Sequence, residues 1–399
     1  MNKHYFLFDI DGVLLNPGGY RKAASDTVQH YFKDLGFKNI HIDLSAFERF
    51  ESLEITNEWD MISFYIISSL ELFFDSIQLK VNVDTREKLI SLIKNKNIQP
   101  GTPIHKLDVL LEFIEDGRSK TSCVYNQFHS EKFVKHFPKI QNYAPWLVED
   151  LLSQTDDPRI SKTTAYFQNL ILGEKLFEEI FSSVAMIKTD SYLSLYDKKN
   201  LDEFFRNKLV KLISEKTIQC SAMTARPTTV SKGNKKTEMY FPEGELGLKT
   251  VGLEQIPVIG FGSLSYLANM VGQTSVYYLK PSPIHALAAI LAAAGYSDVD
   301  SVMFAHEIFN DFKHPKNQER LKELFLGNVE ISIFEDSTNG IRSVKNLSAW
   351  LESVGYPVKV HLYGITQNSY KALALKKENA AIYNDINAAL KKGLGMIKD

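Results

Sequence analysis

Two carboxylates stand two residues apart at the end of an apolar run near the start of the sequence. Residues 4–8 read HYFLF, and Asp9-Ile10-Asp11-Gly12 follows directly. A carboxylate can attack phosphorus and form an aspartyl phosphate. A second carboxylate beside it can act as a general acid and then as a base, and Gly12 permits a sharp turn. The alternative interpretation of the pair is an ordinary acidic turn.

Thr224 ends a second apolar run, in the segment SAMTARP. Its hydroxyl could donate a hydrogen bond to a phosphate oxygen. The alternative is a threonine that caps a helix or closes a turn. Ser221 is a weaker candidate for the same role because it falls inside the expected strand.

Two further segments carry charged groups after apolar runs. Lys280 lies in YLKPSP, where it would be a point charge for a phosphate, and the alternative is a surface lysine. Glu335 and Asp336 follow ISIF. Their carboxylate oxygens are the hard ligands that Mg²⁺ prefers, and the alternative is an aspartate that caps the next helix.

These residues need a sheet to bring them together, and the sequence predicts one. Apolar runs that read as strands alternate with helical patterns, which favours an α/β fold with a parallel, helix-covered sheet. In such a sheet, functional groups gather at the carboxyl ends of the strands. The expected strands are 4–9, 217–224, 256–261, 274–279, 330–334 and 358–363, and two of the helical patterns span 283–294 and 340–354.

A long helical region separates the first expected strand from the others. Only four of the 21 glycines lie between residues 20 and 214, and apolar residues recur there at helical spacing. Because the strand at 4–9 has no local partner, we expect it to join the later strands. The sequence therefore predicts a catalytic core of residues 1–16 and 217–399, with a helical domain at 17–216. The helices expected in that domain are 21–36, 46–79 (one helix or two), 84–96, 104–116, 160–182 and 200–214.

The order of the four motifs resembles that of the haloacid dehalogenase-like (HAD) hydrolase superfamily. FLFDIDGVL resembles its first motif, MTARP its second, KPSP its third and FEDSTNGI its fourth. The last two are close to the form seen in β-phosphoglucomutase-like phosphatases. The resemblance covers residues 1–16 and most of 217–399. The intervals between motifs two, three and four are longer than usual for this family, which predicts insertions near 228–255 and 299–328.

The resemblance implies a Rossmann-like core and a Mg²⁺-dependent phosphatase that works through an aspartyl phosphate. Asp9 would be the nucleophile, and Asp11 the general acid and base. The ion would be held by the Asp9 carboxylate, the Asp11 backbone carbonyl and the Asp336 carboxylate. Glu335 would either ligate the ion or orient a ligand, and Asp336 is favoured as the ligand itself.

The remaining motif residues would hold the phosphoryl group. Thr224, Ala225 and Lys280 would bind the substrate, with Thr224 and Lys280 donating to the phosphoryl oxygens during transfer. Lys280 would also keep Asp9 ionised. An acid at position 11 favours phosphoryl transfer, because dehalogenases of this family lack it. A phosphomutase that uses the same aspartyl phosphate is the nearest alternative, and a non-catalytic ligand-binding or scaffold protein with this fold is another.

The insertion at 17–216 resembles by its position the cap domains of this family, of the C1 type, and it would be unusually large. A closing cap excludes water and favours a small phosphorylated metabolite over a folded protein as substrate. Arg21 and Lys22 could reach anionic groups of the substrate, although solvated charges at a helix start are the plainer interpretation. The sequence names neither the metabolite nor the oligomeric state.

The charge composition of the chain limits the kinds of partner that it is expected to bind. The net charge of −2 gives no basic field for nucleic acid or anionic membranes. The short basic loop at 232–236 reads as a solvated turn.

The longest apolar stretch, residues 61–74, is too short and polar to span a bilayer, and the N-terminus lacks the features of a signal peptide. Cys123 and Cys220 make no disulfide framework and are expected to be buried thiols, which favours a cytoplasmic setting. His285 is expected to be structural.

Overall fold

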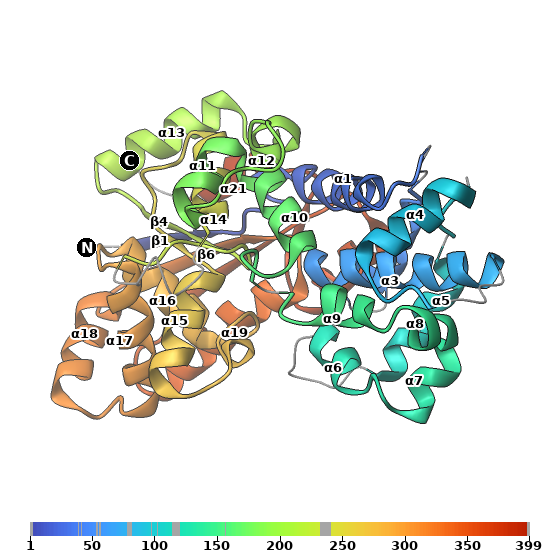
Figure 1. The fold of residues 1–399 in the computed structure, drawn as a ribbon. Coiled ribbons are helices and arrows are strands. Elements are labelled where there is room, and N and C mark those ends of the chain that lie inside the picture. Colours follow the sequence, from blue (N-terminus) through green and yellow to red (C-terminus); the bar gives the residue numbers. More distant parts are fainter. Residues whose placement is uncertain are drawn as a thin grey trace. The chain divides into compact units, whose positions relative to one another are not determined.

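A computed structural model of the chain describes residues 3–396, apart from gaps at 39, 41, 53–54, 56, 78–81, 97, 102, 114–119, 156 and 232–240. The basic loop at 232–236 therefore lies outside the described residues. The chain divides into two compact units, shown in Figure 1. The first unit is Met1–Pro17 with Asp197–Asp399, and the second unit is Gly18–Tyr196.

The first unit is built on a six-stranded sheet in which every neighbouring pair is parallel. The α/β class and the parallel sheet predicted from the sequence are therefore confirmed. The strand from the N-terminus, β1, lies in the middle of the sheet between β4 and β6, as expected from its lack of a local partner. The order across the sheet is β5 (Val258–Ile259), β4 (Gln219–Met223), β1 (Lys3–Phe8), β6 (Val329–Glu335), β7 (Lys359–Ile365) and β8 (Ala381–Tyr383).

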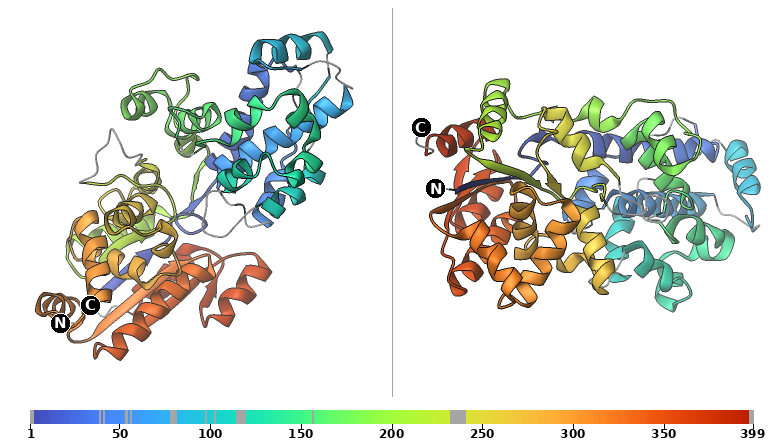
Figure 2. Two further views of the ribbon diagram at one scale, coloured as in Figure 1. Left: turned by 60° about the horizontal axis from the view of Figure 1, so that its bottom comes forward. Right: turned by 90° about the vertical axis from the view of Figure 1, so that its left-hand side faces the viewer.

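Side chains of β1 alternate between two cores, one on each face of the sheet. Tyr5 and Leu7 enter one core, and Phe6 and Phe8 enter the other. The right-hand view of Figure 2 shows helices on both sides of the sheet. The first core contains residues of α15 (Phe261–Val271), α16 (Pro283–Ala293), α17 (Asp298–Asn310), α18 (Pro315–Phe325), α19 (Thr338–Ser353) and α20 (Ser369–Lys377). The second core contains residues of α13 (Glu203–Ser214), α14 (Glu243–Val251) and α21 (Ile386–Leu394).

The prediction of a strand at 274–279 is wrong. The segment forms a single 3-10 turn, η2 (Ser275–Tyr277), and Val276 and Tyr277 are exposed. Only Tyr278 is fully buried, against the α16 core. The run resembles a strand in composition, but it has no row of buried side chains that would fix it in a sheet. The strand β8 was also not predicted from the sequence.

The boundary predicted after residue 216 differs from the division in the structure. Residues 197–216 belong to the first unit, and they include the helix expected at 200–214, which is α13. Leu201 and Leu209 pack in the same core as Phe6 and Cys220 of the sheet. The amphipathic pattern of this helix was correct, but the pattern alone could not say which core it covers.

A two-stranded antiparallel ribbon joins the chain before and after the second unit. It pairs β2 (Leu15–Asn16) with β3 (Lys198–Lys199). The backbone N–H of Asn200 also donates to the carbonyl of Leu14 at 2.9 Å. The chain therefore leaves and re-enters the first unit at neighbouring positions.

The described residues of the second unit are largely helical, as predicted. The expected helix at 46–79 is two helices, and Asn57 caps the second of them with its side chain. The expected helix at 160–182 is broken at Gly173, whose φ of 79° favours glycine. The helices are α1 (Gly19–Asp34), α2 (Ser45–Ser52), α3 (Glu58–Ser76), α4 (Arg86–Lys96), α5 (Ile104–Leu110), α6 (Lys120–Asn126), α7 (Glu131–His136), α8 (Pro138–Tyr143), α9 (Trp146–Leu152), α10 (Lys162–Leu172), α11 (Glu174–Phe181) and α12 (Tyr192–Tyr196), with η1 (Leu111–Phe113) after α5.

The helices α6 to α9 were not predicted from the sequence. They have only six or seven residues each, so that few turns of apolar periodicity mark them. Within the described part of the chain, no helix has the length and apolar character needed to cross a membrane.

Candidate active site

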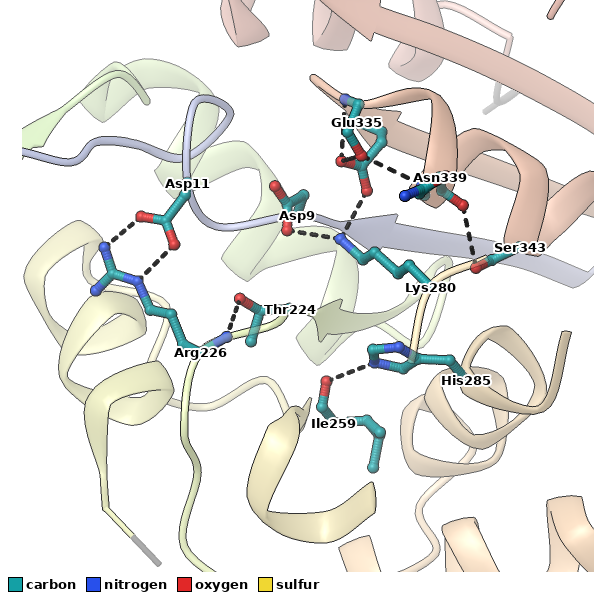
Figure 3. Close-up of polar contacts among 12 residues, drawn as sticks. Asp9, Asp11, Thr224, Arg226, Ile259, Lys280, His285, Glu335, Asn339 and Ser343 are labelled. Atoms are coloured by element: carbon teal, nitrogen blue, oxygen red, sulfur yellow. Dashed lines mark hydrogen bonds and ion pairs between the residues drawn. The ribbon is translucent and has the colours of Figure 1, made fainter. Parts of the chain in front are cut away.

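Three neighbouring strands deliver the candidate residues to one edge of the sheet. Asp9 follows the last residue of β1, Thr224 follows the last residue of β4, and Glu335 is the last residue of β6. Because these strands are parallel and adjacent, their carboxyl ends meet at the same edge. Lys280 comes from the loop between η2 and α16 and reaches the same place, as Figure 3 shows.

Lys280 bridges two buried carboxylates. Its Nζ lies 2.7 Å from Oδ1 of Asp9 and 2.7 Å from Oε2 of Glu335. The Lys280 side chain is 10% exposed, so it is not the surface lysine of the alternative interpretation. Burial alone would lower the pKa of Lys280, but Asp9 and Glu335 raise it above its usual value. Burial and the nearby Glu335 raise the pKa of Asp9, and Lys280 acts against both effects.

Asp336 completes an acidic cluster, which consists of Asp9, Glu335 and Asp336. One carboxylate oxygen from each lies within 4.8 Å of the others. Asp336 is less buried than the other two, and its Oδ2 accepts a hydrogen bond from Nζ of Lys371 at 2.6 Å. It does not cap the following helix, because the side chain of Ser337 does so, through Gly340 N.

Two glycines make room for this acidic cluster. A side chain at Gly340 would place its Cβ 1.7 Å from Oε2 of Glu335. At Gly12, a Cβ would lie 2.5 Å from Oδ2 of Asp336, and the φ of 77° also favours glycine. The sharp turn predicted at Gly12 is present, with its N–H donating to the carbonyl of Leu15 at 2.8 Å.

Asp11 points to a different cation. Arg226 donates from Nε to Oδ2 of Asp11 at 2.8 Å and from NH2 to Oδ1. The same NH2 donates to Oδ2 of Asp197 at 2.9 Å. Figure 3 shows Asp11 turned toward Arg226, while Asp9 faces Lys280. The two acids of the first motif therefore leave the strand together but have separate partners.

Thr224 is buried between Arg226 and Lys280, and Ala225 beside it is exposed. The Thr224 hydroxyl accepts a hydrogen bond from the backbone N–H of Arg226 at 3.1 Å. This contact belongs to a turn, which was the alternative interpretation of Thr224, and it leaves the hydroxyl proton available to another acceptor. Ser221 lies inside β4 and donates to the carbonyl of Ala289, so it is no part of this edge.

Among the other residues considered from the sequence, His285 is fully buried. Its Nε2 donates to the carbonyl of Ile259 at 3.0 Å, and burial, with a smaller effect of Lys280, lowers its pKa to about 3. Cys123 and Cys220 are buried thiols, and burial raises the pKa of Cys220.

Arg21 and Lys22 lie in the first turns of α1, in the second unit. Both are exposed. Lys22 Nζ contacts Asp26 at 2.7 Å, one helical turn further on. This contact is the ordinary arrangement of a solvated helix surface.

Arg226, Asp197 and Lys371 were not identified from the sequence. Arg226 contacts Asp11, Lys371 contacts Asp336, and Asp197 contacts Arg226. Arg226 carried a usable signal, because it is the one cation in the segment TARP that follows the β4 strand. Lys371 also follows a strand, β7, at the start of the next helix. Asp197 carried no signal, because nothing in the local sequence shows that it is buried.

The donor set of the acidic cluster fits Mg²⁺. Three carboxylate oxygens converge within 4.8 Å of one another, and hard oxygen ligands are those that Mg²⁺ takes. In the described residues, no other group of three or more His, Cys, Asp or Glu side chains meets the same distance limit. Glu335 has the geometry of a ligand as much as Asp336 has.

Neither a family model nor a curated protein matches this chain. Among solved structures, the X-ray structure of Northeast Structural Genomics Consortium target ZR25 has a TM-score of 0.59 at 15% identity, over 97% of this chain and 96% of that one. The phosphatase Tt82 from Thermococcus thioreducens has a TM-score of 0.41 at 12% identity, over 93% of this chain and 99% of that one. The first likeness shows a shared fold.

Proposed function

We propose that the chain is a HAD-like hydrolase that removes phosphate from a small phosphorylated metabolite. One observation carries this proposal: Asp9, Glu335 and Asp336 converge at the sheet edge, with Lys280 bound to the first two. A nucleophilic carboxylate, a buried cation and further oxygen ligands are the groups that phosphoryl transfer requires.

In this proposal, Asp9 attacks the phosphorus and the ester oxygen leaves. Asp11 protonates that oxygen and then takes a proton from the water that hydrolyses the aspartyl phosphate. Lys280 and the Thr224 hydroxyl bind the phosphoryl oxygens, so that the charge of the transition state meets fixed donors. Ala225 lines the same loop and contributes to substrate binding.

The residues that would hold Mg²⁺ are Asp9, Asp336 and Glu335, with the backbone carbonyl of Asp11. A bound divalent ion offsets the repulsion between an anionic nucleophile and an anionic substrate. Lys280 already offsets part of this repulsion, because it shares its charge between Asp9 and Glu335.

The second unit would act as a cap that favours a small substrate, and a cytoplasmic setting would suit the two buried thiols. A phosphomutase would use the same groups, and nothing in the geometry favours it over hydrolysis. A mutase would yield an isomerised phosphate ester with little free phosphate. A chain that keeps the fold only for binding would release no phosphate from any ester in a broad panel.

The test is Asp9→Asn, assayed with Mg²⁺ on 4-nitrophenyl phosphate and on a panel of metabolite phosphates. We expect turnover to fall by more than about 10³-fold, because the amide cannot attack phosphorus. Undiminished turnover would exclude Asp9 as the nucleophile.

Asp385→Asn is the matched control in the same unit. The Asp385 side chain accepts from the N–H of Ala388 at the start of α21. An asparagine keeps this cap, so we expect turnover within about twofold of the unmodified chain.

A further inference from the structure

Arg226 is a buried cation that the proposed reaction does not use directly. Its side chain is only 2% exposed, and three of its donor atoms have partners. Nε and NH2 form a two-point contact with Asp11, NH2 also reaches Asp197, and NH1 lies 3.5 Å from the carbonyl of Glu243. The planar guanidinium fixes the direction of each of these bonds.

The partners of Arg226 differ in their freedom to move. The Asp197 side chain has no solvent exposure, whereas that of Asp11 is 34% exposed. Asp197 follows directly after the second unit and directly precedes β3. The pairing of β3 with β2 holds the backbone next to Asp197 in place. Asp197 is therefore the anchor of the guanidinium, and Asp11 is the partner that can reorient.

The backbone of Arg226 is fixed independently of its side chain. Its N–H donates to the Thr224 hydroxyl at 3.1 Å, and its carbonyl accepts from the N–H of Phe261 at 2.9 Å. The α14 helix packs closely on the guanidinium, because a Cβ at Gly247 would lie 3.2 Å from NH1. A change of the Arg226 side chain alone would thus leave the contact to Thr224 in place.

We propose that Arg226 is a positioning residue that sets the orientation of the Asp11 carboxylate, and that Asp197 holds Arg226 in place for this role. The inference rests on the proposed function, in which Asp11 transfers the proton to the leaving oxygen. Each carboxylate oxygen of Asp11 accepts one N–H of Arg226 and keeps a second lone pair, which carries the proton that passes to the leaving oxygen. Without the two-point contact, Asp11 samples several rotamers, and proton transfer to the leaving group becomes slower.

Leaving groups of different basicity separate this role from a general loss of structure. An alkyl phosphate needs a proton on its leaving oxygen, whereas 4-nitrophenolate leaves without one. We expect Arg226→Met to lower kcat on an alkyl phosphate by about 100-fold. The loss on 4-nitrophenyl phosphate should be no more than a few-fold, with KM little changed on both. Arg226→Lys should recover only part of the loss, since a point charge cannot replace the fork, and Asp197→Asn should cause a smaller loss of the same kind.

The same substitution is then made in an Asp11→Asn background, where Arg226→Met should have no further effect on either ester. Equal losses on both esters, or a further loss in that background, would overturn the inference. Arg320→Lys is the control, since the Arg320 guanidinium lies 3.2 Å from Glu307 and stacks on Phe304 in the same unit. It should leave the ratio of the two activities unchanged.

A second measurement is independent of turnover. Urea unfolding of Arg226→Met, Asp11→Asn and the double variant gives the coupling between the two side chains, because each single change breaks the two-point contact. We expect this coupling to be at least about fivefold in the unfolding equilibrium constant. If the unmodified chain hydrolyses neither ester, the proposed function is wrong. The coupling then shows only whether Arg226 and Asp11 interact. A coupling below twofold would overturn the inference whatever the activity.

Discussion

The two acids of the first motif lie in contrasting surroundings at the same edge of the sheet. Asp9 shares Lys280 with Glu335, and Asp11 shares Arg226 with Asp197. Each cation is buried and serves two carboxylates. A lysine is a compact point charge, however, whereas an arginine offers a fork of fixed donors.

This difference decides what else can bind. The lysine leaves several oxygens of the acidic cluster facing one another within 4.8 Å, which suits a further cation. The arginine takes up both oxygens of Asp11 with its own N–H groups. The carboxylates that share Lys280 can therefore still bind a metal ion, whereas the Asp11 carboxylate is held in one orientation by the two N–H donors of Arg226.

The largest expected effect that tests this comparison is that of Lys280→Met. It leaves Asp9 and Glu335 buried without their shared cation, and a buried charge without its partner is strongly destabilising. We expect the free energy of unfolding, measured with urea in the absence of metal, to fall by about 3–5 kcal/mol. Adding Asp9→Asn should restore part of this loss.

Lys345→Met is the control for Lys280. Lys345 pairs with Glu378 at 2.6 Å on the surface of the first unit, where solvent screens the ion pair and its contribution to stability is small. A similar loss for both lysines would mean that the buried bridge has no special weight.

Gly340→Ala is expected to lower the free energy of unfolding less than Lys280→Met does, but more than Gly247→Ala does. The added methyl group meets the acidic cluster at position 340, whereas at position 247 it lies close to Arg226. The first Cβ would lie 1.7 Å from Oε2 of Glu335, so Glu335 must leave its place beside Lys280. We expect a loss of about 2 kcal/mol. At Gly247 the nearest atom is a methyl of Ile10 at 3.1 Å, and the better helix propensity of alanine offsets the contact to within about 1 kcal/mol. Thermal unfolding of both variants checks this order, and the reverse order would refute it.

The smallest effect on stability is expected from Lys371→Met, because the Lys371 side chain is 56% exposed. The change should stay within about 0.5 kcal/mol. Lys371 Nζ and a metal ion would compete for the Asp336 carboxylate, however. We expect the Mg²⁺ concentration that gives half the maximal thermal shift to fall by up to about 30-fold, because a unit charge about 4 Å from a divalent ion in water costs about 2 kcal/mol. Lys371→Arg should keep the original concentration, and an unchanged midpoint in Lys371→Met would show that the lysine does not compete.

Much of the acidic cluster could be predicted because its residues follow buried strands directly in the sequence. The runs before Asp9 and before Glu335 are apolar enough to specify strands, and parallel strands end at a common edge. Lys280 was predicted both from a strand expected at 274–279 and from its KPSP motif. The expected strand is a 3-10 turn, so only the motif indicated the position of Lys280 for a reason that the structure supports.

The arginine contact could not be predicted, because it depends on a fold that local patterns do not encode. Asp11, Asp197 and Arg226 come from three separate segments, and only their packing shows that they meet. Lys371 is similar, since it reaches Asp336 from the helix that follows a different strand. The assignment of α13 to the first unit also required knowledge of which core its apolar face joins.

The short ribbon of β2 and β3 has a consequence for how such a chain can be rebuilt. It places Asn16 opposite Lys198, so the two points where the second unit is inserted are adjacent in the first. The entropy lost on closing a loop grows only slowly with its length. A shorter or longer insert with neighbouring ends would therefore leave the register of the main sheet unchanged. The first unit is thus a scaffold into which other inserts can be spliced at this ribbon.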